Sequence, residues 1–278
     1  MKIFIDTNIF LDFYRSNNDT IKLLETLDRY FDSIVLTEQV VIEFARSREA
    51  VIRDVRKRFL AEGTLQQFSS SFLHSFSEFK KLIMLRGQYD EQQKEVRNII
   101  DKAIIAEGED PVTFFFNEFV NHCDSKNAIL NVTPEIVTKA YNRKMMGSPP
   151  VSKDRYSIGD EINWEIILAN VRDNLILVTR DSSYQENFNF LDFDFLQASG
   201  SKIVKVTDKI SDALQLIDGM ANPAFKALEE QMLKDIRYLN NYWRTPVEKD
   251  KPIFSHELQS DEESVKLPTT PPDFDMGE

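Results

Sequence analysis

Short apolar runs that end in polar residues recur along the chain and predict the strands of a parallel sheet. Residues 3–5 (Ile-Phe-Ile) form the first run, which stops at Asp6. Similar runs cover residues 33–36, 175–179 and 203–206. Near-continuous apolar runs of this length are typical of parallel strands that are buried on both faces.

Between these runs, apolar residues recur every three to four positions, which predicts helices. We expect these helices at residues 17–30, 38–59, 65–106, 134–145, 160–171, 208–217 and 223–242. Strands that alternate with helices indicate an α/β fold with a central parallel sheet. Because the pattern stays helical from about 60 to 145, we interpret that stretch as a helical insertion. We expect its phenylalanines, Phe72 and Phe76 among them, to be buried packing residues rather than base-stacking platforms.

These patterns divide the chain into a domain at 1–220, a C-terminal helix at 221–244 and a tail at 245–278. The tail contains nine acidic and three basic residues, so it carries half of the total net charge of −12, and it holds five of the ten prolines. This composition predicts a disordered, acidic segment. The overall negative charge argues against a protein that coats nucleic acid non-specifically.

The few cysteines and histidines limit the location and the chemistry of the chain. A single Cys123 excludes a disulfide framework within the chain and fits a reducing, cytoplasmic environment. Three scattered histidines make a zinc site improbable. Asp6 interrupts the opening apolar run, and no run approaches the roughly 18 apolar residues of a membrane span. We therefore expect neither a signal peptide nor a membrane association.

Four carboxylates occupy positions that a parallel sheet would bring to one edge. Asp6 and Asp181 follow strands, Glu43 lies in the first turns of a helix after a strand, and Asp160 begins the helix before the strand of Asp181. Such a cluster needs a counter-cation, and carboxylates select hard ions such as Mg²⁺ or Mn²⁺. One or two such ions would support phosphodiester hydrolysis by metal-activated water.

Some of these assignments have alternatives. An aspartate at a strand end also serves as an ordinary helix cap. Glu161 or Glu165 could take or share the place of Asp160. Lys153 and Arg155 precede Asp160 and are candidates for phosphate contacts. A solvated loop that contacts no substrate is the alternative interpretation of these two residues. The same two interpretations apply to a basic row on the helix of Glu43, formed by Arg46, Arg53 and Lys57.

The motifs around the four carboxylates resemble those of the PIN domain, a nuclease family, in the subgroup with a long helical insertion. They are Phe-Ile-Asp-Thr-Asn at 4–8, Thr-Glu-Gln-Val-Val-Ile-Glu-Phe at 37–44, Gly-Asp-Glu-Ile-Asn-Trp at 159–164 and Leu-Val-Thr-Arg-Asp at 177–181. The resemblance implies a three-layer α/β/α fold and metal-dependent cleavage of RNA. It also implies that Asp6, Glu43, Asp160 and Asp181 hold the metal and act in catalysis, and that Asn8 and Thr179 support them.

Two other functions compete with a nuclease. A phosphatase of the haloacid-dehalogenase type also begins with a strand that ends in Asp, but it requires a second Asp where this chain has Asn8. A non-catalytic PIN-like binding module would keep the fold without the activity. The resemblance also leaves open a toxin or defence role with an inhibitory, antitoxin-like protein partner, and a homo-oligomer.

Overall fold

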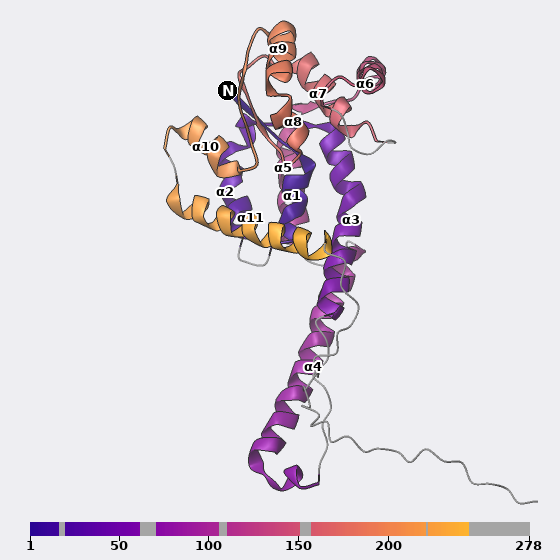
Figure 1. Cartoon of the computed structure of the whole chain (residues 1–278), viewed down its shortest axis with the longest axis vertical. Helices are drawn as coiled ribbons and strands as arrows, with labels where there is room; N and C mark the ends of the chain where they lie inside the picture. Colours follow the sequence, from indigo (N-terminus) through magenta and orange to yellow (C-terminus); the bar gives the residue numbers. More distant parts are fainter. Residues whose placement is uncertain (17–19, 62–70, 106–109, 151–156, 221, 245–278) are drawn as a thin grey trace, which may run out of the picture.

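Figure 1 shows the chain in a computed structural model, which describes residues 1–16, 20–61, 71–105, 110–150, 157–220 and 222–244. The predicted tail at 245–278, together with Lys153 and Arg155, lies outside the described residues.

The centre of the molecule is a sheet of five parallel strands in the order β3-β2-β1-β4-β5. The strands are β1 (Lys2–Ile5), β2 (Ile34–Thr37), β3 (Ile129–Leu130), β4 (Leu175–Val178) and β5 (Ile203–Thr207). All four residues of β4 are completely buried, as its unbroken apolar sequence predicts. The chain therefore has the predicted α/β fold.

Helices cover both faces of this sheet and give the three layers (Figure 1). One group, in which α7 contacts both of its partners, contains α6 (Pro134–Met146), α7 (Gly159–Asn170) and α9 (Phe188–Ser199). The other group contains α2 (Ile21–Leu27), α5 (Pro111–Ser125), α10 (Ile210–Asp218) and α11 (Pro223–Arg244). Shorter helices α1 (Thr7–Leu11), η1 (Asp12–Tyr14), η2 (Asp28–Ser33) and α8 (Ser182–Glu186) connect these layers. No helix in the described part of the chain is long and apolar enough to cross a membrane.

Strand β3 departs from the all-helical pattern expected at 60–145, and helix α5 packs in the main core of the molecule. Strand β3 pairs with β2 at the edge of the sheet, and its two residues are too few to show a strand period. Helix α5 contributes to the main core, where the ring of Phe116 stacks on Phe44 with 3.9 Å between the ring centres. The second half of this stretch is thus integrated with the sheet layers.

Two long helices, α3 (Glu38–Ala61) and α4 (Ser77–Ile104), form an arm that extends from the body (Figure 1). A short helix, η3 (Leu73–Ser75), precedes α4. The expectation that Phe72 and Phe76 are buried is wrong, because their side chains are 69% and 45% exposed. They flank η3, which precedes α4 at the end of the arm away from the body (Figure 1). The sheet layers are out of reach there, so the helical spacing of apolar residues does not lead to burial.

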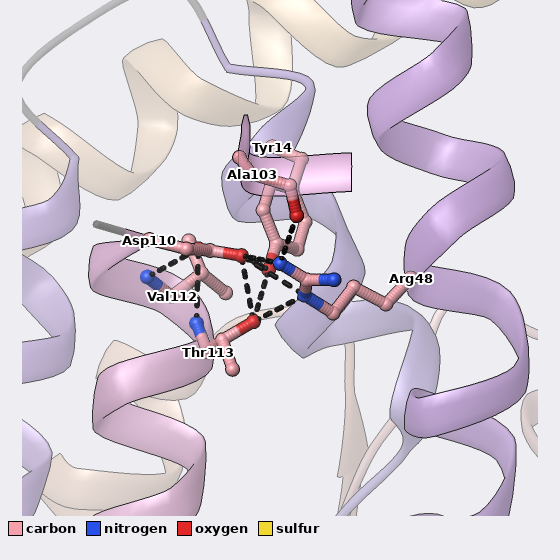
Figure 2. Close-up of polar contacts among 6 residues, drawn as sticks. All are labelled: Tyr14, Arg48, Ala103, Asp110, Val112 and Thr113. Atoms are coloured by element: carbon pink, nitrogen blue, oxygen red, sulfur yellow. Dashed lines mark hydrogen bonds and ion pairs between the residues drawn. The ribbon is translucent and has the colours of Figure 1, made fainter. Parts of the chain in front are cut away.

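A polar cluster fixes the base of the arm to the body (Figure 2). Arg48 on α3 forms an ion pair with Asp110 at 2.7 Å and donates to the carbonyl oxygen of Ala103 at 2.6 Å. Asp110 also caps α5 by accepting the backbone N–H groups of Val112 and Thr113, and it accepts the hydroxyl of Tyr14 at 2.7 Å. This cluster joins α3, the end of α4, α5 and η1 at one buried point.

The C-terminal helix is held by a buried carboxylate. Glu229 on α11 accepts the backbone N–H groups of Ile210 and Ser211 at 2.5 and 2.9 Å, so it caps the amino end of α10. Phe225, Met232 and Ile236 on the same helix are buried in the main core. Helix α11 is therefore part of the folded body.

Candidate active site

Asp6 and Asp181 meet because β1 and β4 are neighbours in the sheet. Ile5 pairs with Val178 in register, so the residues after each strand leave the sheet side by side. The Thr179 hydroxyl donates to Oδ2 of Asp6 at 2.8 Å and accepts the backbone N–H of Asp181 at 3.1 Å. Thr179 thus connects the two acidic residues.

Glu43 reaches the same edge from the first turns of α3. Its carboxylate accepts the hydroxyl of Thr7 at 2.9 Å and the side-chain amide of Gln39 at 2.8 Å. It also lies against Gly159 at the start of α7, where an added Cβ would be 2.0 Å from Glu43 Oε1. Two donors and one glycine therefore define the position of this carboxylate.

Asp160 completes the cluster from the first turn of α7. Burial, followed by the charges of Asp6, Asp181 and Glu43, raises the pKa of Asp160 to about 7. Burial also raises the pKa of Asp6, to about 6, against the opposing effect of the hydrogen bond from Thr179. Asp6, Asp181 and Glu43 are thus close enough to Asp160 to disfavour its charged form, and Glu43 acts on Asp6 in the same way.

A buried tyrosine lies within the same electrostatic field. Tyr184 on α8 is 2% exposed. Burial and then the charges of all four carboxylates raise its pKa well above the ordinary value. Its ring meets the buried Trp164 edge-on, with 6.5 Å between the ring centres.

The other predicted residues fall into three groups. Asn8 is exposed and donates to Asp6 at 3.4 Å, and Arg46 is exposed one turn after Glu43. Glu161 and Glu165, the alternatives to Asp160, form ion pairs with Lys144 at 3.4 Å and with Arg143 at 2.7 Å respectively. Lys153 and Arg155 are outside the described residues.

Sequence reasoning missed several residues that shape the site. Thr7 and Gln39 orient Glu43, and Gly159 makes room for it. Gln39 precedes Glu43 by four residues on a helix, a spacing that indicates contact and could have identified it. The buried Asp12, which forms an ion pair with Arg180, has no comparable signal because the two residues are far apart in sequence.

The donor set is compatible with a hard divalent cation. The four side chains offer only carboxylate oxygens, which Mg²⁺ and Mn²⁺ prefer, and a cation would relieve the electrostatic cost that raises the pKa of Asp6 and of Asp160. Within the described part of the chain, no three Asp, Glu, His or Cys side chains are already arranged to hold a metal ion.

A cavity of about 470 Å³ opens beside the cluster. It is lined by Thr179 and Asp181 on one side and continues past Thr207 and Asp208 to Ile236 of α11. A bound molecule would thus have access to the acidic edge of the sheet from the side of β5.

Comparisons with known proteins agree with this geometry. No curated protein and no solved structure matches the chain. A family model described as PIN domain matches residues 3–184, a span that is well over half of the 278 residues and includes the positions of all four carboxylates. The chain therefore belongs to the PIN domain family.

Proposed function

We propose that the chain is a metal-dependent ribonuclease that hydrolyses phosphodiester bonds at the cluster of Asp6, Glu43, Asp160 and Asp181. PIN domains are generally nucleases and typically bind divalent metals. The observation that best supports the proposal is the electrostatic coupling of the four carboxylates. A partly buried group of like charges costs stability and is retained where a function requires it.

In this proposal the protein positions the acidic groups, and Mg²⁺ or Mn²⁺ provides the Lewis acidity. When bound, such an ion polarises a phosphate group and lowers the pKa of water. Thr179 fixes Asp6, Thr7 and Gln39 fix Glu43, and the backbone N–H of Ser183 binds Asp181, so three of the four carboxylates are oriented in advance. Asn8 and Arg46 lie at the exposed margin, where they are candidates for contacts with the substrate, with Lys153 and Arg155 as further candidates.

Asp6→Asn and Asp181→Asn test the proposal. Each variant should reduce Mg²⁺- or Mn²⁺-dependent cleavage of RNA by at least about 10³-fold, because each removes a metal-binding charge. Thermal stability without metal should stay equal or rise for Asp6→Asn, since burial raises the pKa of Asp6 and its charged form costs folding energy at neutral pH. The exposed Asp124 on α5 provides a control, and Asp124→Asn should cleave normally.

Each alternative has its own result in the same assay. Equal cleavage by Asp6→Asn and the native chain would contradict the assignment of Asp6. Binding of RNA without any metal-dependent cleavage would favour a non-catalytic binding module. A phosphorylated Asp6 would favour the phosphatase. Cleavage that stops when a second protein is bound would support a toxin-like role with an inhibitory partner.

A further inference from the structure

A buried ion pair joins the two segments of the chain that follow β1 and β4. Asp12 in η1 is only 2% exposed, and one of its carboxylate oxygens pairs with Arg180, the residue immediately before Asp181. The other oxygen accepts a hydrogen bond from Arg15 at 3.0 Å. Because Asp12 follows Asp6 by six residues, the pair connects the surroundings of two predicted metal ligands.

Asp12 is held in place by its neighbours in the chain. Phe10, Leu11 and Phe13 are between 1% and 4% exposed and belong to the main core. Since the residues on both sides of Asp12 are packed in the core, its carboxylate can move little. Asp12 therefore provides a fixed point to which Arg180 is attached.

The segment from Thr179 to Asp181 leaves the sheet at the end of β4. The backbone N–H of Thr179 still donates to the carbonyl oxygen of Thr207 in β5 at 2.9 Å. Beyond that bond, the Thr179 hydroxyl links the segment to Asp6 and to the N–H of Asp181. The pair of Arg180 and Asp12 is a second link between this segment and the chain that follows β1.

A buried ion pair adds little net stability, because the cost of removing both charges from water offsets their attraction. It does restrict geometry, since each carboxylate oxygen of Asp12 has its own arginine partner. We propose that the pair of Asp12 and Arg180 is a positioning clasp that holds Asp181 beside Asp6 in the arrangement that binds the metal. Both residues act through Asp181, and the proposal rests on the proposed function of the acidic cluster.

Hydrogen exchange of the full chain without metal tests the clasp itself. In Arg180→Met the backbone N–H of Asp181 should exchange about ten times faster, because the segment loses its link to Asp12 and opens locally more often. Arg48→Met is the matched control, since it also breaks a buried ion pair, at the base of the arm. Exchange at Asp181 should stay native in the control. Native exchange at Asp181 in Arg180→Met would overturn the proposal.

Binding of Mn²⁺ without RNA, followed by electron paramagnetic resonance, tests the effect of the clasp on the metal site. Arg180→Met should weaken Mn²⁺ binding by about 10- to 100-fold, the usual effect of losing a partner that orients a metal ligand. Arg48→Met should bind Mn²⁺ like the native chain. Faster exchange at Asp181 combined with native Mn²⁺ affinity would contradict the positioning role.

A double variant separates positioning from stability. Asp12→Leu with Arg180→Met removes both charges and keeps apolar side chains in their place, so its thermal midpoint should be close to the native value. Its Mn²⁺ affinity and its exchange at Asp181 should stay as altered as in Arg180→Met, because the link is still absent. Native values of all three quantities would show that the pair only fills space and would overturn the proposal. A native chain that binds no Mn²⁺ would refute the proposed function instead, and hydrogen exchange would still decide whether the clasp exists.

Discussion

Glu43 can reach the acidic cluster because residue 159 has no side chain. An added Cβ at Gly159 would be 2.0 Å from Glu43 Oε1 and 3.1 Å from the side-chain nitrogen of Gln39. The first distance is too short for any stable contact, so something must move. The atom in the way is the far end of a flexible side chain, which can rotate at little cost, whereas the backbone of α7 is fixed by packing.

Gly159→Ala is therefore expected to displace the Glu43 carboxylate rather than to unfold the protein. The displacement of the Glu43 carboxylate should lower the cleavage rate by about 10- to 100-fold, because a shift of about 1 Å at a catalytic group has effects of this size. The thermal midpoint should change by only a few degrees. Initial rates with saturating Mg²⁺ or Mn²⁺, measured together with thermal melts, separate the two effects.

Gly87 provides the matched control for this substitution. It also lies in a helix, but a Cβ there would meet nothing within 4 Å. Gly87→Ala should leave cleavage unchanged and raise stability by up to about 1 kcal/mol, the usual difference between Gly and Ala in a helix. Equal activity of the two variants would show that the close approach of Gly159 to Glu43 has no catalytic importance.

At the scale of elements, the arm depends on the buried pair of Arg48 and Asp110. Their side chains are 11% and 5% exposed. Burial alone would raise the pKa of Asp110, but hydrogen bonds from Thr113, Tyr14 and Arg48 outweigh it, and the pKa is lowered overall. The charged form of Asp110 is therefore the one that the folded structure stabilises.

Arg48→Met should destabilise the fold by about 3–5 kcal/mol, because it leaves a buried carboxylate without its cation. Urea denaturation measures this loss. The exposed pair of Arg53 and Glu49, one turn further along the same helix, is the control. Glu49→Gln should cost less than about 1 kcal/mol. Similar costs at the two sites would mean that the polar cluster does not anchor the arm.

The elements also show what the sequence can and cannot predict. Strands β1, β2, β4 and β5 and the long helix α3 were predictable, because each has an uninterrupted apolar run or a clear helical period. Asp6 and Asp181 could be placed together because both directly follow parallel strands. Strand β3 was not predictable from two residues, and the exposure of Phe72 depends on where the arm projects, which is a tertiary property.

For the whole molecule, truncation is expected to have a different effect at each of the two C-terminal segments. Deleting residues 245–278 should leave the thermal midpoint nearly unchanged, because their composition has too few apolar groups to offset the entropy of ordering. Deleting residues 221–278 should lower the midpoint by about 10 °C, because it also removes the buried residues of α11. Equal midpoints for the two truncations would contradict the assignment of α11 to the body. A large loss with the shorter deletion would contradict the disorder that composition predicts for residues 245–278.

The cap that Glu229 places on α10 has a consequence for how the protein folds during its synthesis. The backbone N–H groups at the start of α10 find their acceptor only on α11, about twenty residues later in the chain. During synthesis, β5 and α10 therefore leave the ribosome before the residue that completes them exists. Because domains fold as they emerge, the last layer of this molecule can close only when translation of α11 has finished. Until then, the apolar face that α11 covers is exposed on the nascent chain.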